Sequence, residues 1–189
     1  RTFHFVFTNE QGTTSLPDGL TFSAATGDVE RPDRFEAKVQ TKLKLIPITV
    51  TIVGVGSKVY YQNPITHHFH EISSSTAALA LLNPAPLLVA AISQIQRPVI
   101  SGTEQVNNVA TTRVDGLLDI PATGPGTPSA LPFDTGGKPL PLSIWIDATG
   151  HTVQLRLTGP LRAGDSNSVV RQLDLSQFNE TVNIQAPNQ

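Results

Sequence analysis

The sequence predicts an α+β fold in which an antiparallel β-sheet carries two short helices, and residues 1–189 are expected to form this one domain. Three observations predict this class. Segments with a two-residue alternation of apolar and polar residues recur along the chain, turn residues separate them at short intervals, and one stretch rich in alanine and leucine interrupts them. The short intervals favour antiparallel strands, because parallel strands need a long crossover.

The clearest strand is expected over residues 34–45, where the alternation is strict. One face would carry Phe35, Ala37, Val39, Thr41, Leu43 and Leu45, and the other face would carry Arg34, Glu36, Lys38, Gln40, Lys42 and Lys44. Because side chains alternate across a strand, one face is expected in water and the other against something apolar. Function therefore depends on what that apolar face covers.

The remaining strands are expected on both sides of the alanine-rich stretch. They fall at residues 2–8, 19–27, 47–55 and 57–61 before it, and at 105–119, 141–148, 151–161 and 168–174 after it. Residues 121–141 are too rich in proline and glycine for regular structure, so a long loop is expected there.

Two short helices are expected at residues 77–82 and 87–95, on either side of Pro84 and Pro86. The preceding serines and Asn83 suit helix caps, and proline is tolerated in the first turn of a helix because its missing N–H has no partner there. In the second helix one apolar stripe is expected, made of Leu87, Leu88, Ala91, Ile92 and Ile95.

About nine strands and two short helices leave an imbalance, because a helix covers only about 10 Å of a sheet's width. The sheet must close on itself, pack as two layers, or keep an apolar cavity beside the helices. The alanines of the helices favour the cavity because they fill little space, although alanine is also simply a good helix former.

Composition and motifs exclude several function classes. The net charge of −2 and the scattered cations argue against nucleic acid as a partner, and the absence of cysteine excludes a thiolate site. The apolar stretch at 77–95 is broken by prolines and is not a membrane span.

The candidate sites for metal binding or catalysis are weak. His67, His68 and His70 favour a solvated hairpin tip over a metal site. No nucleophile elbow, phosphate loop or convergent carboxylate pair occurs, so we expect no enzyme, metal or cofactor.

Four short motifs follow one another in a distinctive order. They are Val59-Tyr60-Tyr61, Leu82-Asn83-Pro84, Gly102-Thr103-Glu104 and Trp145-Ile146-Asp147. From Phe3 to about Leu175 their order and spacing resemble the mycobacterial LppX/LprA/LprF/LprG lipoprotein family and, more remotely, the LolA and LolB carriers. The resemblance implies a strongly curved antiparallel sheet, or half-barrel, with short helices on its concave face and a cavity for lipid between them.

The same resemblance implies a non-enzymatic carrier of an acylated lipid or glycolipid. Such a protein would be exported to the cell envelope, at the outer face of the cytoplasmic membrane or in a periplasm-like space. A lipid anchor upstream of this sequence would attach it to the membrane, and we expect a monomer. The alternative is an envelope interaction module that binds a partner protein on the concave face, and a third interpretation is an esterase of unfamiliar design.

The residues expected to line the lipid cavity lie on one strand and on both helices. They are Phe35, Ala37, Val39 and Leu43 from the strand and Leu79, Leu82, Leu87, Leu88, Ala91 and Ile92 from the helices, and Phe3, Phe5 and Phe7 could extend the wall. Simple core packing is the alternative for each of them, since inward alternation and helical stripes occur in any packed core.

Overall fold

The computed structural model describes residues 1–16, 19–72, 84–119, 137–161 and 165–188. In these residues the chain forms twelve strands and one helix. Before the helix come β1 (Thr2–Gln11), β2 (Thr14–Ser15), β3 (Leu20–Glu30), β4 (Arg34–Leu43), β5 (Ile46–Val55), β6 (Lys58–Gln62) and β7 (Phe69–Ile72). Then follow α2 (Pro84–Gln94), β8 (Ile95–Val106), β9 (Val109–Leu118), β10 (Leu140–Asp147), β11 (Thr152–Thr158) and β12 (Val170–Ser176).

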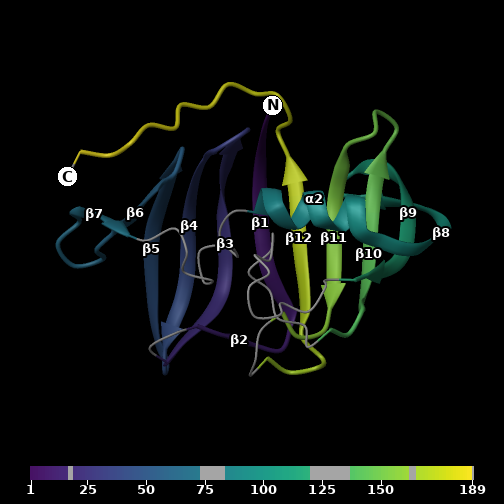
Figure 1. Ribbon diagram of the computed structural model, residues 1–189, viewed down its shortest axis with the longest axis horizontal. Coiled ribbons are helices and arrows are strands. Elements are labelled where there is room, and N and C mark those ends of the chain that lie inside the picture. Colours follow the sequence, from purple (N-terminus) through teal and green to yellow (C-terminus); the bar gives the residue numbers. More distant parts are fainter. Residues whose placement is uncertain (17–18, 73–83, 120–136, 162–164, 189) are drawn as a thin grey trace.

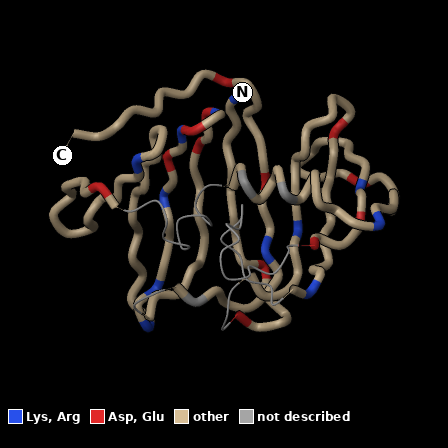
Figure 2. The backbone as a smooth tube through the Cα atoms, viewed as in Figure 1, with Lys and Arg blue, Asp and Glu red and all other residues tan. Residues whose placement is uncertain are grey.

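The strands form one sheet in the order β7-β6-β5-β4-β3-β1-β12-β11-β10-β9-β8, with β2 paired to β3 beside this path (Figure 1). Every neighbouring pair is antiparallel, which confirms the predicted class. β1 pairs with β12, so the first and last strands meet near the middle of the sheet. Figure 2 shows lysine and arginine residues scattered along the sheet rather than gathered in one stripe.

Helix α2 lies across one face of the sheet, in front of β1 and β10–β12 in Figure 1. The side chains on that face form the main core. Phe3, Phe5 and Phe7 of β1 alternate inward and are buried together with Leu87 and Ala91 of the helix. This burial is the main stabilising term for the fold, since each large apolar side chain removed from water contributes about 1.5–3 kcal/mol.

β4 follows its expected alternation as far as the turn. Phe35, Ala37 and Val39 are buried, and Gly54 on β5 leaves room for the ring of Phe35, because a Cβ there would lie 2.2 Å from it. The strand ends at Leu43 rather than at residue 45, because Lys44 adopts a positive φ of 58° in the turn. Leu45 is consequently exposed, and the expectation that it faces an apolar surface is wrong.

The alternation does not predict β8, because Pro98 and Gly102 interrupt it. β8 is an edge strand with two irregularities in its pairing to β9, and proline is tolerated at such positions because no ladder hydrogen bond is needed. The strand expected at 105–119 therefore starts too early, because β9 begins at Val109. Asn107 and Asn108, both with positive φ, form the turn between β8 and β9.

Some expectations fall outside the described residues. These are the helix at 77–82, with Leu79 and Leu82, and most of the loop at 121–141. Within the described ranges, no helix is long and apolar enough to cross a membrane. The same ranges hold no group of three or more His, Cys, Asp or Glu residues arranged to hold a metal ion.

Candidate binding pocket beside helix α2

A pocket of about 610 Å³ lies between α2 and one end of the sheet. The start of β1, the β3–β4 turn, the β10–β11 turn and the end of β12 supply its other walls. Its volume is within the range of about 300–1,000 Å³ in which proteins hold small molecules and cofactors. The pocket is therefore large enough to hold part of an organic ligand.

One side of α2 lines the pocket with Ala85, Leu88, Val89 and Ile92. These positions are spaced by three or four residues, so they lie on one helical stripe. We call them the pocket stripe. Val89 is 55% exposed and Ile92 is 61% exposed, although both are apolar. Leu87 and Ala91, which we call the core stripe, are buried in the main core on the adjacent side. The helix is thus apolar on two sides, of which only one is fully buried.

The sheet supplies the rest of the apolar lining. Phe3 from β1 and Leu175 from β12 are buried residues at the bottom of the pocket. Phe178, two residues after the end of β12, packs against the same core. The antiparallel pairing of β1 with β12 brings these residues together from opposite ends of the sequence.

The segment after β12 is fixed to the start of β1 by hydrogen bonds. The backbone N–H of Asn179 donates to the carbonyl oxygen of Thr2 at 2.9 Å, and the hydroxyl of Thr2 donates to the carbonyl oxygen of Glu180 at 2.6 Å. Farther along, Arg34 donates to the carbonyl oxygen of the buried Ile184. These bonds hold Phe178 and Asn179 in place as part of the pocket wall.

The β10–β11 turn at the pocket rim is organised by Asp147. Its carboxylate accepts hydrogen bonds from the backbone N–H of Thr149 at 2.9 Å and of His151 at 2.8 Å, and from the Thr149 hydroxyl at 2.7 Å. Partial burial opposes ionisation of Asp147, but these hydrogen bonds and the His151 imidazole outweigh it and lower its pKa. The ring of His151 stacks on Phe178 with centroids 4.4 Å apart.

Among the described residues, the polar part of the pocket lining contains arginines but no carboxylate. Arg1 and Arg31 lie beside each other, since the backbone N–H of Arg31 donates to the carbonyl oxygen of Arg1, and His151 lies on the β10–β11 turn. An apolar floor with polar and cationic groups at its edge can accommodate an amphiphilic molecule.

The structure separates the residues that the sequence proposes as cavity lining. Leu88 and Ile92 line the pocket, whereas Phe35, Ala37, Val39, Leu87 and Ala91 belong to the packed core. Leu43 lies at the β4–β5 turn, is 39% exposed and does not line the pocket. Leu79 and Leu82 lie outside the described residues.

Sequence reasoning missed several pocket residues. Val89 could have been found from its helical spacing to Ile92, because residues three apart share a side of a helix. Phe178 and His151 carry no such signal, since each lies just outside a strand and reaches the pocket through the fold.

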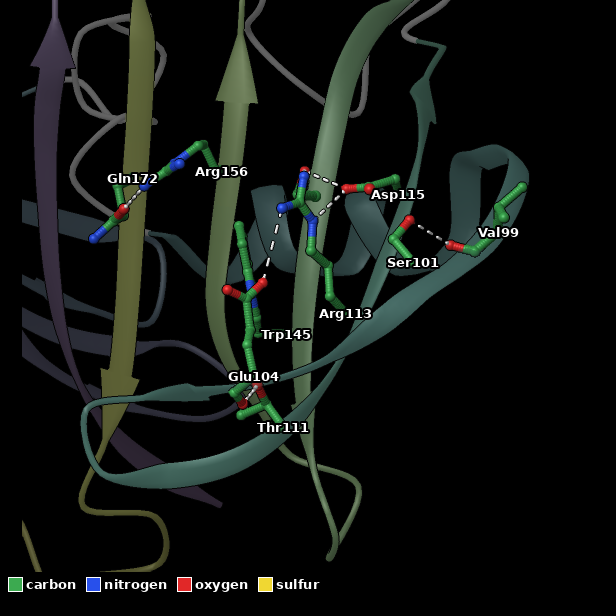
Figure 3. Close-up of polar contacts among 10 residues, drawn as sticks. Val99, Ser101, Glu104, Thr111, Arg113, Asp115, Trp145, Arg156 and Gln172 are labelled. Atoms are coloured by element: carbon green, nitrogen blue, oxygen red, sulfur yellow. Dashed lines mark hydrogen bonds and ion pairs between the residues drawn. The ribbon is translucent and has the colours of Figure 1, made fainter.

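The opposite face of β10 carries a cluster of polar contacts around Trp145 (Figure 3). The indole N–H of this buried residue donates to Glu104 at 2.6 Å, and the guanidinium groups of Arg113 and Arg156 lie 5.2 and 5.7 Å from its ring centroid. Arg113 in turn donates to Asp115 at 2.9 Å. Partial burial opposes ionisation of Asp115, but bonds from Ser101, Ser143 and Arg113 outweigh it and lower its pKa. These contacts stabilise β8–β11.

Comparison with known proteins agrees with this architecture. The family model for the LppX_LprAFG lipoproteins matches residues 3–184, and the chain therefore belongs to this family. The crystal structure of LprF from Mycobacterium bovis has a TM-score of 0.65 and 19% identity, covering 100% of this chain and 90% of that chain. Mycobacterium tuberculosis LppX has a TM-score of 0.60 and 20% identity, covering 97% and 89%. These two likenesses show that the chain has an LppX/LprF-like fold.

A curated relative gives a more local match. It is LprF of Mycobacterium tuberculosis, which carries the name of a diacylated glycolipid transporter, and it is 34% identical over 59 residues. The match covers 31% of this chain and 22% of the relative's length. A LolA superfamily protein from Nitrosomonas europaea is more distant, with 10% identity over 93% of this chain and 84% of that chain, and its TM-score of 0.33 supports no inference.

Proposed function

We propose that this protein is a non-enzymatic carrier of an acylated lipid or glycolipid in the bacterial cell envelope. In this proposal the acyl chains lie in the pocket beside α2. The pocket stripe of α2 is the observation that carries it, because Val89 and Ile92 expose apolar side chains at the edge of an open pocket of suitable size. An apolar stripe that the described residues leave exposed is suited to contact with an apolar ligand.

A lipid carrier needs such an apolar volume for energetic reasons. Moving an acyl chain through water costs about 0.8 kcal/mol for each CH₂ group, so a sixteen-carbon chain approaches ~12 kcal/mol as an upper bound. Only contacts that replace water along the chain reduce this cost. Phe3 offers such contacts from β1, and Leu88 and Ile92 offer them from the pocket stripe.

The half-barrel curvature and the wider cavity belong to the same proposal. A sheet curved around α2 would bring the wall of Phe35, Ala37 and Val39 towards the helix. These residues and the core stripe form a packed wall behind the pocket, and they would contact lipid only if the core opened. Leu88 and Ile92 are the direct contacts.

Location follows from the family rather than from the pocket. Lipoproteins are exported and attached through a lipid, so we place this protein in the cell envelope with an anchor preceding the sequence. A diacylated glycolipid is the ligand class that the name of the LprF relative suggests. An anchored carrier would receive and release its lipid without leaving the membrane surface.

Fluorescence of a lipophilic dye tests the proposal directly. We expect the dye to bind the protein and to be displaced by a diacylated glycolipid but not by the same glycan without its acyl chains. The variant Val89→Ser/Ile92→Ser should weaken dye binding about tenfold or more, because two apolar contacts are lost. A matched control is Val99→Ser/Ile100→Ser, which alters an exposed pair of the same residue types on β8.

Two outcomes would contradict lipid carriage. One is the absence of saturable dye binding, and the other is equal weakening by the pocket variant and the β8 control. Displacement of the dye by an envelope protein, but not by lipid, would instead favour the interaction module.

A further inference from the structure

The turn between β4 and β5 projects an apolar tip from the end of the sheet. We define the β4–β5 tip as residues 42–46, which are all exposed. Leu45 is 92% exposed and Ile46 is 65% exposed, and Leu43 beside them is partly exposed. Aliphatic side chains are the least suited of all residues to the point of a turn, where small and polar residues are usual. Their presence there calls for a contact outside the protein.

The β4–β5 tip is held rigidly. Leu43 pairs with Ile46 in an unbroken antiparallel register that continues along both strands as far as Arg34 and Val55. Lys44 takes the positive φ that a tight two-residue turn needs. The leucine and isoleucine are thus presented by a regular hairpin, and folding back to bury them would break this register.

The charged residues nearest to the tip in the sequence have one sign. From residue 37 to residue 70 the sequence contains Lys38, Lys42, Lys44 and Lys58 and no aspartate or glutamate. Figure 2 shows lysines at the lower end of this hairpin, with no acidic residue at the turn. In the described part of the chain, Lys58 pairs with Glu71 at 2.9 Å, whereas Lys42 and Lys44 form no ion pair.

We propose that the β4–β5 tip docks on an anionic lipid bilayer. Leu45 and Ile46 would enter the boundary between headgroups and acyl chains, while Lys42 and Lys44 would remain among the lipid phosphates. Long lysine side chains suit this position, because their stems lie along apolar material and their ammonium groups stay in the polar layer. Exposed apolar residues flanked by cations are the combination that binds membrane interfaces.

The size of the tip favours a bilayer over a protein partner. A stable protein interface buries more than about 1,000 Å² and requires a complementary shape, whereas five residues at a turn offer neither. A bilayer accepts a small protruding tip without any complementary pocket. The tip also lies at the end of the sheet opposite the N-terminus and the pocket rim (Figure 1), so docking would leave the pocket accessible.

Co-sedimentation with lipid vesicles tests this proposal. We expect the wild type to bind vesicles of phosphatidylcholine mixed with phosphatidylglycerol more tightly than vesicles of phosphatidylcholine alone, and added salt should weaken the binding. The variant Lys42→Gln/Lys44→Gln should lower the partition coefficient on mixed vesicles about thirtyfold, or about fivefold for each lysine. Lys58→Gln is the matched control, because that ammonium already pairs with Glu71.

The apolar contribution is tested with Leu45→Ser/Ile46→Ser, which should lower binding about tenfold or more. Val99→Ser/Ile100→Ser, the exposed pair on β8, should bind like the wild type. Thermal unfolding of each variant checks that the fold is retained.

Three results would overturn docking of the tip on anionic lipid. In the first, the wild type binds both kinds of vesicle equally well. In the second, the tip variants bind mixed vesicles as tightly as the wild type. In the third, the β8 control loses as much binding as the tip variants. Docking can be tested independently of lipid carriage. Val89 and Ile92 line the pocket and do not belong to the tip, so the variant Val89→Ser/Ile92→Ser should bind vesicles like the wild type. The failure of one proposal can therefore be told from the failure of the other.

Discussion

The core stripe and the pocket stripe of α2 consist of the same kinds of residue but have different surroundings. Leu87 and Ala91 are buried against the sheet, whereas Val89 and Ile92 remain largely in water beside a pocket. Burial of the first pair stabilises the fold. The second pair contributes little to folding because it is mostly exposed, and we therefore propose that it contacts ligand. In this proposal, one side of the short helix serves stability and the adjacent side serves binding.

The largest effect is expected for Phe3→Ala, because Phe3 belongs to both the core and the pocket lining. Loss of this buried ring should lower the free energy of unfolding by about 3–5 kcal/mol and should also weaken dye binding. Chemical denaturation and dye titration measure the two effects. A loss confined to stability would show that the bottom of the pocket does not contact ligand.

Leu87→Ala should lower the free energy of unfolding by about 2–5 kcal/mol, since it leaves a cavity in the core. Dye affinity, measured on the folded fraction, should change much less, because Leu87 does not line the pocket. If affinity fell as far as it does in the pocket variant, the two stripes would not be separate.

Asp147→Asn should lower the free energy of unfolding by about 1 kcal/mol at neutral pH, because it weakens the hydrogen bonds that close the β10–β11 turn. The lowered pKa of Asp147 means that the carboxylate stabilises the fold above its ordinary value of 3.8, and that this contribution is lost as pH falls through the folded-state pKa. The difference between wild type and variant should therefore shrink below about pH 4. Denaturation across a pH series measures this trend, and a constant difference would contradict it.

The smallest effect on stability is expected for Ile92→Ala, which should stay within about 0.5 kcal/mol because the side chain is mostly exposed. Dye affinity should nevertheless fall several-fold, since an apolar contact is removed from the pocket. Comparison with Leu87→Ala on the same helix gives the sharpest contrast between the two stripes. Equal stability losses in the two variants would mean that Ile92 is part of the core.

The sequence predicted the sheet where alternation is strict. The inward alternation of Phe3, Phe5 and Phe7 and that of Phe35, Ala37 and Val39 are confirmed by burial. β8 could not be predicted in this way, because Pro98 and Gly102 break the pattern and an edge strand does not need it. A pattern along one segment indicates which side is apolar, and it cannot show whether a strand lies at an edge.

The pocket was predictable only in part, for a similar reason. Helical spacing joined Leu87, Leu88, Ala91 and Ile92 in one stripe, whereas the structure divides them between core and pocket. The division depends on where the sheet ends beneath the helix, and this is set by pairings distant in sequence, such as β1 with β12. Leu175 and Phe178 reach the pocket through the same pairing.

Lipid carriage is tested most directly by native mass spectrometry of the protein purified from its source, before and after organic extraction. We expect the protein to carry the added mass of an acylated lipid, to lose it on extraction, and to carry less in the Val89→Ser/Ile92→Ser variant. The mass of the bare chain before extraction, in wild type and variant alike, would contradict it.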